Sequence, residues 1–114
     1  MKAIQIIEHG DIKVLNCTDI TEPICSPNKI KVKMEACSIN HLDIWVRQGI
    51  PGLKLPLPLI LGSDGSGVIV QIGSNITTFE VGDEIIVQPG TYDKKCDMVR
   101  KGKENFSKSY GILG

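Results

Sequence analysis

Charged and hydrophobic residues alternate without a break over residues 29–36, which read Lys-Ile-Lys-Val-Lys-Met-Glu-Ala. Successive side chains of a strand point to opposite faces, so this alternation predicts a β-strand with one solvated face. Weaker β patterns bounded by Gly, Pro, Asn or Asp cover residues 3–7, 12–15, 67–72 and 84–87. Sequential strands joined by short polar turns favour a mostly β sandwich or barrel.

One segment, residues 40–48, has the spacing of a helix instead. Its apolar residues recur at i, i+3 and i+4: Leu42, Trp45 and Val46. Asn40 suits the N-cap position and Gly49 the C-terminal stop, so we expect a short helix. The segment follows directly on the predicted strand at 29–36. Asn40 therefore projects from a strand-to-helix junction, where functional side chains often lie.

Periodicity disappears over residues 91–110, while the density of charged residues rises. Twenty residues of irregular structure are unusual in a compact domain. Such a segment is normally a functional insert or is held by a ligand. We therefore expect an irregular lobe here.

Composition narrows the possible partners and location. The chain has 114 residues, of which 41% are hydrophobic, and this fits one globular domain. Thirteen basic and thirteen acidic residues give no net charge, so we expect neither nucleic acid nor a membrane as partner. No signal-peptide pattern opens the chain, and we expect a cytoplasmic protein. Its cysteines, at positions 17, 25, 37 and 96, form no CxxC pair and should remain free thiols.

Residues 62–67, Gly-Ser-Asp-Gly-Ser-Gly, invite comparison with dinucleotide-binding loops. A strand follows this segment instead of a helix, so no helix N-terminus is available for a pyrophosphate. The glycines are better explained by a bulge or by close backbone approach in a curved sheet. Ser63 and Asp64 can be turn formers and nothing more.

A hydrolase is not supported. His41 stands beside Asn40, but no GxSxG nucleophile motif accompanies it. A solvent-facing residue in the first helical turn is the simpler interpretation of His41. Residue chemistry alone thus leads to a β-rich domain and no further.

Four segments taken in order, residues 36–43, 59–68, 72–73 and 81–83, resemble the medium-chain dehydrogenase/reductase superfamily. The whole chain resembles the N-terminal GroES-like domain of its alcohol dehydrogenase-type and quinone oxidoreductase-type members. The resemblance implies a mostly β, partly open barrel with one or two short helices and a zinc-lobe remnant at residues 91–110. No single segment would suffice, but the ordered set is specific.

The resemblance also bears on catalytic zinc. In zinc-dependent members the position of Asn40 is a cysteine ligand, and that of Ser63 is a histidine ligand followed by an acid, here Asp64. Amide and hydroxyl oxygens are weak ligands for zinc, so we expect no catalytic zinc. Asn40 resembles instead the zinc-free quinone oxidoreductase branch, in which hydrogen bonds polarise a carbonyl.

A structural zinc site in family members uses four cysteines with a spacing that is intact here. Those positions carry Asp93, Cys96, Val99 and Ser107, so one cysteine of the four survives. Without zinc to order it, we expect a metal-free and mobile lobe.

Related enzymes continue into a Rossmann domain that binds NAD(H) or NADP(H), and this part is missing from the chain. We therefore interpret residues 1–114 as a fragment of a zinc-free NAD(P)H-dependent oxidoreductase that transfers hydride to or from a ketone, quinone or enone. Alone it should bind no cofactor and be inactive. Asn40 would hydrogen-bond the substrate or nicotinamide, with Ser63 and Asp64 lining the former metal site. Trp45 would pack at the cleft, or else in the core.

A noncatalytic GroES-like module that binds a partner protein is the alternative interpretation. Unpaired strand edges would present backbone donors and acceptors, which also makes self-association possible.

Overall fold

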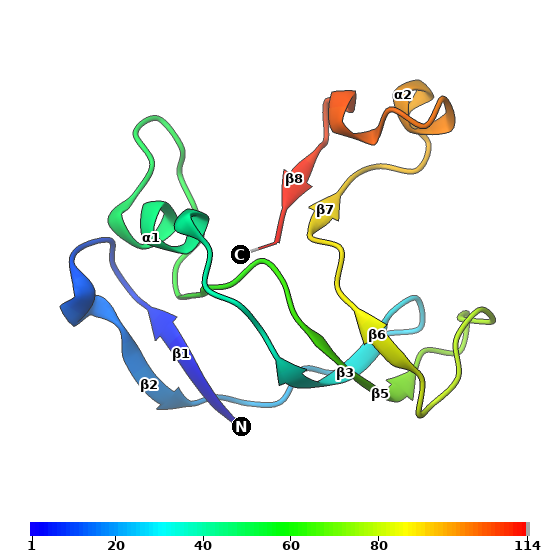
Figure 1. Cartoon of the computed structure of the whole chain (residues 1–114), viewed down its shortest axis with the longest axis horizontal. Coiled ribbons are helices and arrows are strands. Elements are labelled where there is room, and N and C mark those ends of the chain that lie inside the picture. The colour runs from blue at the N-terminus through cyan, green and yellow to red at the C-terminus, as the bar shows by residue number, and fades with distance from the viewer. Residues whose placement is uncertain (114) are drawn as a thin grey trace.

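The structure, a computed structural model, describes residues 1–113 of the 114-residue chain. Short strands dominate it, with two α-helices and two 3₁₀ helices between them (Figure 1). In chain order the elements are β1 (Lys2–Ile6), η1 (Ile12–Val14), β2 (Asn16–Asp19), β3 (Ile30–Ala36), α1 (His41–Gln48), β4 (Leu59–Ile60), β5 (Ser66–Ile72), β6 (Glu84–Ile86), β7 (Gly90–Thr91), α2 (Asp97–Arg100), η2 (Glu104–Phe106) and β8 (Gly111–Ile112).

The strands form three separate antiparallel sheets. Their orders are β2-β1-β4, β3-β5-β6 and β7-β8. Over the described residues the three sheets share no strand, so they do not close into one barrel. The expectation of a mostly β, partly open architecture with one or two short helices is confirmed.

The expected strand at residues 12–15 is wrong. These residues form the 3₁₀ helix η1, because the carboxylate of Asp11 accepts a hydrogen bond of 2.8 Å from the backbone N–H of Lys13 and starts a tight turn. The neighbouring strand β2 was not predicted from the sequence. It is polar and mostly exposed, so it lacks the apolar alternation that marks a half-buried strand.

The longest pairing joins β3 to β5, and it passes through two irregularities in register, at Lys31/Val32 and at Met34/Ala36. Gly67 lies in this region with its Cα against β3. A Cβ at position 67 would overlap the backbone carbonyl oxygen of Lys33. The expectation of close backbone approach in a bulged sheet is therefore confirmed for Gly67 and not for Gly62, which has no neighbour from elsewhere in residues 1–113 within 4 Å of a Cβ.

Helix α1 packs on the rest of the chain through Val46, which is 4% exposed. The C-terminal end of the helix is held by the loop after β1. Nδ1 of His9 lies 2.9 Å from the carbonyl oxygen of Val46. The backbone N–H of Gly10 donates to the carbonyl oxygen of Arg47 at 2.9 Å. Gly49 ends the helix at φ +91°, a conformation that favours glycine. No helix within residues 1–113 is long and apolar enough to span a bilayer.

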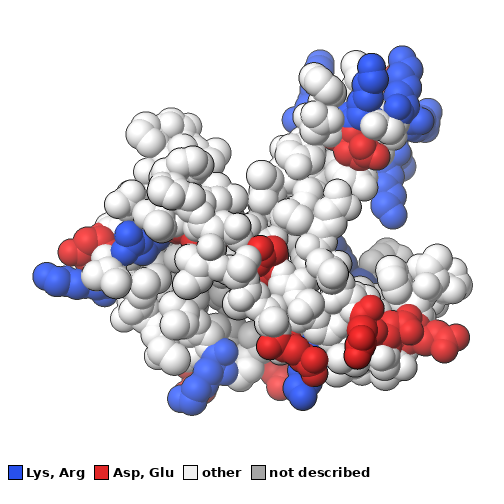
Figure 2. All heavy atoms as spheres, viewed as in Figure 1, with Lys and Arg blue, Asp and Glu red and all other residues white. Residues whose placement is uncertain are grey.

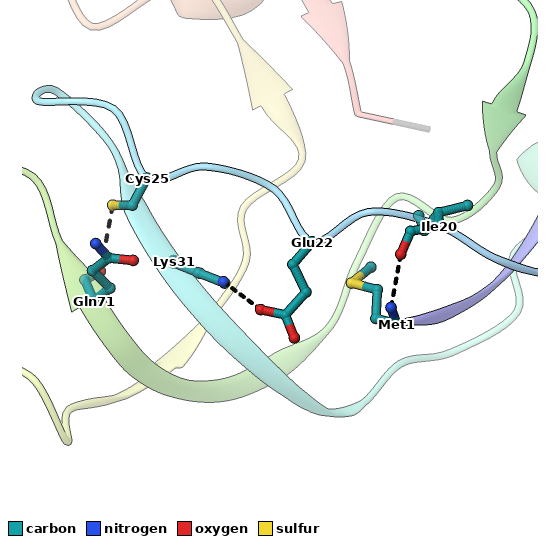
Figure 3. A network of polar contacts seen from close by, with 6 residues as sticks. All are labelled: Met1, Ile20, Glu22, Cys25, Lys31 and Gln71. Carbon is teal, nitrogen blue, oxygen red and sulfur yellow. Dashed lines mark hydrogen bonds and ion pairs between the residues drawn. The ribbon is translucent and has the colours of Figure 1, made fainter.

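The segment between β2 and β3 ties the first sheet to the second (Figure 3). The N-terminal ammonium of Met1 donates to the carbonyl oxygen of Ile20 at 2.7 Å. Lys31 of β3 pairs with Glu22 at 2.7 Å, and the thiol of Cys25 lies 3.8 Å from a carbonyl oxygen of β5. These contacts are polar and mostly exposed, so they orient the sheets without adding a large buried core.

The hydrophobic core is small. Ile6, Val46 and Ile69 are the buried hydrophobic side chains of the described residues. The solvent-accessible surface is 8629 Å², against about 6100 Å² for a compact monomer of this mass. The radius of gyration is 15.7 Å, against about 13 Å for a compact chain of this length. Much apolar surface thus remains open, Ile24 and Ile86 being 93% and 85% exposed.

The expected lobe is an excursion from a two-stranded neck. Strand β7 pairs with β8 through Gly90↔Ile112 and Thr91↔Gly111, so residues 92–110 leave and return at one place. Within the excursion lie α2 and η2, which pack on each other. Basic side chains gather over this part of the molecule (Figure 2).

The close approach of β5 to β3 leads to a first prediction. Gly67→Ala should lower the free energy of unfolding by about 2 kcal/mol, because the new methyl group forces the two strands apart. Gln71→Ala, at an exposed position of the same strand, should change it by less than about 0.5 kcal/mol. Urea denaturation of both variants measures the difference. Equal midpoints would refute the tight packing at Gly67.

Candidate functional site

The candidate site begins at the junction between β3 and α1. Asn40 occupies the N-cap position with extended backbone angles, φ −108° and ψ 156°. Its backbone N–H donates to the carboxylate of Asp43 at 2.7 Å, and the N–H of Asp43 donates to the carbonyl oxygen of Asn40 at 3.0 Å. The start of the helix thereby fixes the backbone of Asn40.

A second segment, between β4 and β5, brings Asp64 to this junction. The carboxylate of Asp64 accepts from Nδ2 of Asn40 at 2.9 Å. It also accepts from the backbone N–H of Ser38 at 3.0 Å and from the Ser38 hydroxyl. Three donors at the strand–helix junction thus contact the same carboxylate. Asp64 lies 24 residues after Asn40 and 26 residues after Ser38 in the sequence.

These hydrogen bonds shape the acid–base behaviour of the site. Donation from the Ser38 hydroxyl, then from the Asn40 amide and the Ser38 backbone, lowers the pKa of Asp64 from 3.8 to about 2. Hydrogen bonds to the charged form favour ionisation. Asp64 is therefore a carboxylate at neutral pH, and its oxygens act as acceptors.

Ser63 precedes Asp64 and is buried, with 7% of its surface exposed. The side-chain contact that reaches Asn40 comes from Asp64. The participation of Ser63 in the site stays a prediction.

Trp45 lies on α1 and is 54% exposed, while the neighbouring Val46 is the core residue of the helix. Trp45 is therefore too exposed within residues 1–113 to be a core residue, which was the alternative interpretation. The ring of His41 lies edge-on to the indole, with centroids 4.8 Å apart and planes at 64°. Both rings are thus available on one side of the helix.

An open hollow of about 390 Å³ lies next to Asp64. Its lining residues, drawn from the end of β3, the start of β5 and the end of β6, are Ala36, Cys37, Ser38, Asp64, Gly65, Ser66 and Ile86. Asp64 and Ser38 give this hollow a polar wall, and Ile86, which is 85% exposed, gives it an apolar one. Such a mixture suits a mainly apolar ligand that carries a polar group.

Zinc does not fit the donor set at the junction. The two carboxylates there are already engaged, because Asp64 accepts three hydrogen bonds and Asp43 accepts one from the backbone N–H of Asn40. Asn40 and Ser63 can offer neutral oxygens, which bind zinc weakly. Among residues 1–113, no three His, Cys, Asp or Glu side chains cluster in a way that could hold a metal ion.

The lobe positions expected from a structural zinc site make hydrogen bonds with their surroundings. Asp93, Cys96 and Ser107 line one cavity, and Val99 is not among its lining residues. The N–H of Cys96 donates to the carbonyl oxygen of Asp93 at 3.0 Å, and the buried hydroxyl of Ser107 lies 3.0 Å from that of Ser109. Polar contacts therefore link these turns, and the expected mobility of the lobe stays a prediction.

Residues 62–67 do not form a phosphate-binding loop for a nicotinamide dinucleotide. Residues 62–65 lead into strand β5, and the sheets described over residues 1–113 are all antiparallel. Binding of the pyrophosphate at a βαβ crossover needs a parallel pair and a helix N-terminus. The described residues therefore form no βαβ site for the pyrophosphate, and the expectation that the chain alone binds no cofactor stays a prediction.

Ser38 is the site residue that sequence reasoning missed. It belongs to the segment that carries the family resemblance, yet no role was assigned to it. A signal was present, because side chains two residues apart in an extended segment share a face, and this places Ser38 beside Asn40. That Asp64 would be their common partner could not be read from spacing.

Comparison with known protein families shows which family the chain belongs to. Residues 26–114 match the alcohol dehydrogenase GroES-like domain family. The chain belongs to this family. It represents the N-terminal domain of medium-chain dehydrogenase/reductase oxidoreductases, as the ordered motifs implied.

Two curated relatives illustrate the range of the family. Human quinone oxidoreductase is 35% identical over 75% of this chain, and the match covers 26% of that protein. An NAD-dependent alcohol dehydrogenase from Sulfurisphaera tokodaii is 30% identical over the whole chain, which covers 34% of that protein. The chain thus spans between a quarter and about a third of these relatives.

Solved structures agree with the GroES-like assignment. The crystal structure of an NAD-dependent alcohol dehydrogenase superimposes on the whole chain with a TM-score of 0.94 and 38% identity, over 33% of that protein. Escherichia coli quinone oxidoreductase complexed with NADPH matches 75% of the chain with a TM-score of 0.70 and 28% identity, over 26% of that protein.

The depressed pKa of Asp64 leads to a second prediction. Its ionised form contributes stability above its unfolded-state pKa of about 4, and this contribution is lost as the pH falls through about 2. The difference in Tm between the wild type and Asp64→Asn should therefore be largest near neutral pH and should shrink on acidification.

Thermal melts followed by circular dichroism from pH 7 down to pH 2 measure this difference. Asp97→Asn, on the exposed part of the lobe, is the matched control for the change of one charge. A difference for Asp64→Asn that stays constant across the range would contradict the hydrogen-bonded carboxylate.

Proposed function

We propose that this chain is the substrate-side domain of an NAD(P)H-dependent oxidoreductase that acts without zinc on a ketone, quinone or enone. The observation that carries the proposal is the contact between Asn40 and Asp64. The family resemblance places metal ligands at Asn40 and at Ser63, the neighbour of Asp64. In this chain an amide and a carboxylate meet there through a hydrogen bond.

The role assigned to Asn40 follows from the chemistry of its side chain. A side-chain amide carries two N–H donors, and the contact with Asp64 uses one of them. The second can donate to a substrate oxygen on which negative charge develops. A preorganised donor of this kind lowers a reaction barrier by about 3 kcal/mol. When bound, the nicotinamide supplies the hydride, and residues beyond those described here would hold it.

The surroundings of the junction favour an apolar carbonyl compound. The hollow beside Asp64 is bordered by Ile86, and Ile39, between Ser38 and Asn40, is 89% exposed. The exposed rings of His41 and Trp45 lie on the same helix that Asn40 begins. A quinone, an enone or an apolar ketone would bury such surface and still offer an oxygen to a polar donor.

A noncatalytic protein-interaction module is the second candidate. It is favoured by the large accessible surface and by exposed apolar side chains such as Ile24. Isolated apolar residues are common on protein surfaces, but an open sheet with an unpaired edge is a surface to which another chain can add.

A chimera tests the enzymatic proposal. These residues would replace the matching third of the Sulfurisphaera alcohol dehydrogenase, and oxidation of NADH and NADPH would be followed with ketones, quinones and enones. Asn40→Ala should lower turnover about 100-fold, the equivalent of one lost oxyanion donor. Asn105→Ala, at an exposed lobe position, should leave turnover almost unchanged.

Loss of well under tenfold in Asn40→Ala would remove Asn40 from the mechanism. A folded chimera that binds the cofactor but turns over no carbonyl substrate would favour the interaction module.

Metal content tests the zinc-free part of the proposal. Protein purified with zinc in the medium should contain far less than one equivalent by mass spectrometry, because neither the junction nor the lobe offers a good set of ligands. If the protein contained about one equivalent of zinc, and if the Cys96→Ser variant contained none, the lobe would still hold a structural zinc ion.

A further inference from the structure

We propose that Ser38 is a positioning residue that acts through Asp64 to fix the orientation of the Asn40 side chain. The inference rests on the proposed function, in which Asn40 meets the substrate. It adds a residue to that site and states which atoms of Asn40 remain available. It concerns Ser38, Asp64 and Asn40, which come from two separate segments.

The geometry around Asp64 carries the argument. Ser38 makes a two-point contact, with its backbone N–H and its hydroxyl donating to the two different oxygens of the carboxylate. Two donors on two oxygens prevent the carboxylate from rotating about its last bond. The Ser38 hydroxyl and Nδ2 of Asn40 share one of these oxygens, Oδ2. The oxygen that Asn40 contacts is thus held in place by Ser38.

The fixed carboxylate then selects one orientation of the amide. An ionised carboxylate only accepts hydrogen bonds, so Nδ2 of Asn40 faces it, and Oδ1 is left to the backbone N–H of Asp43 in the capping box. Hydrogen bonds from Ser38 and Asn40 lower the pKa of Asp64, so the carboxylate is ionised near neutral pH. The capping contact between Asn40 and Asp43 fixes the backbone below the side chain. Both ends of the Asn40 side chain are therefore restrained.

This orientation has a chemical consequence. With one N–H of Nδ2 committed to Asp64, and with the side chain of Asn40 also facing the backbone N–H of Asp43 in the capping box, Asn40 offers its remaining N–H as a donor. That donor suits the oxygen of a ketone or quinone. The fixed amide can thus present this N–H to the substrate without a change of rotamer.

A purely structural role for Ser38 makes a different prediction. If its contacts only tie the strand–helix junction to the segment before β5, then Ser38→Ala lowers stability and leaves the Asn40 amide as it is. Positioning predicts instead that the Asn40 amide becomes mobile in a folded protein. The side-chain N–H groups of Asn40 report on this directly.

The experiment is nuclear magnetic resonance of the ¹⁵N-labelled 114-residue chain near neutral pH. In the wild type, the Asn40 side-chain protons should exchange with water more slowly than those of Asn105, which is exposed. Ser38→Ala should speed exchange at Asn40 by about tenfold, as expected for loss of about one hydrogen bond. Ser38→Thr, which keeps the hydroxyl, should restore slow exchange, and Ser74→Ala is a matched serine control at an exposed site.

The outcomes separate the two proposals. Unchanged exchange at Asn40 in folded Ser38→Ala overturns the positioning role. If Ser38→Ala does not fold, the wild type decides: Asn40 protons that exchange as fast as those of Asn105 also overturn it. Activity in the chimera is a separate readout, in which Ser38→Ala should lower kcat/KM and Ser38→Thr should recover it. An inactive chimera together with slow exchange at Asn40 would reject the enzymatic function and retain the positioning.

Discussion

The carboxylate of Asp64 joins two parts of the chain that are distant in sequence. It accepts from Ser38, two residues after the end of β3, and from Asn40, the cap of α1, and it lies on the segment that leads into β5. Because β3 and β5 also pair along their length, this one group closes the corner between the second sheet and the helix. The hydrogen bonds are charge-assisted and are therefore stronger than bonds between neutral groups. These hydrogen bonds hold the candidate site in position, and they lower the pKa of Asp64.

Close backbone packing makes that corner possible. Gly67 brings β5 against β3, and Gly65 lies beside Ala36 and Cys37 just before the Asp64 contact is made. Side chains at these positions would push the segment that carries Asp64 away from the junction. Gly65 and Gly67 thus permit the close approach of this segment to β3 and to the residues that follow it.

The lobe and the junction show similar chemistry. The resemblance implies that zinc-dependent members of the family carry zinc ligands at both places. In this chain both places instead have polar side chains that hydrogen-bond with one another. Comparison with relatives gives a mixed picture of ancestry. Alcohol dehydrogenases match the chain over its whole length, whereas the quinone oxidoreductases described above match three quarters of it. The fold therefore superimposes on an alcohol dehydrogenase over the whole chain, while the likeness of Asn40 to the quinone oxidoreductase branch stays a prediction.

Local signals in the sequence determined much of the fold. Alternation at residues 29–36 and the capping pattern around Asn40 predicted β3 and α1 almost to the residue. The expected contrast between a buried and a solvated face is absent from β3, in which no residue is fully buried. The local signals failed for β2, whose residues are polar and exposed, and for η1, where a single capping carboxylate decides the turn. Only the tertiary structure decided that Asp64 binds both Ser38 and Asn40. A contact across 24 to 26 residues depends on how strands pair and bulge, and periodicity does not encode that.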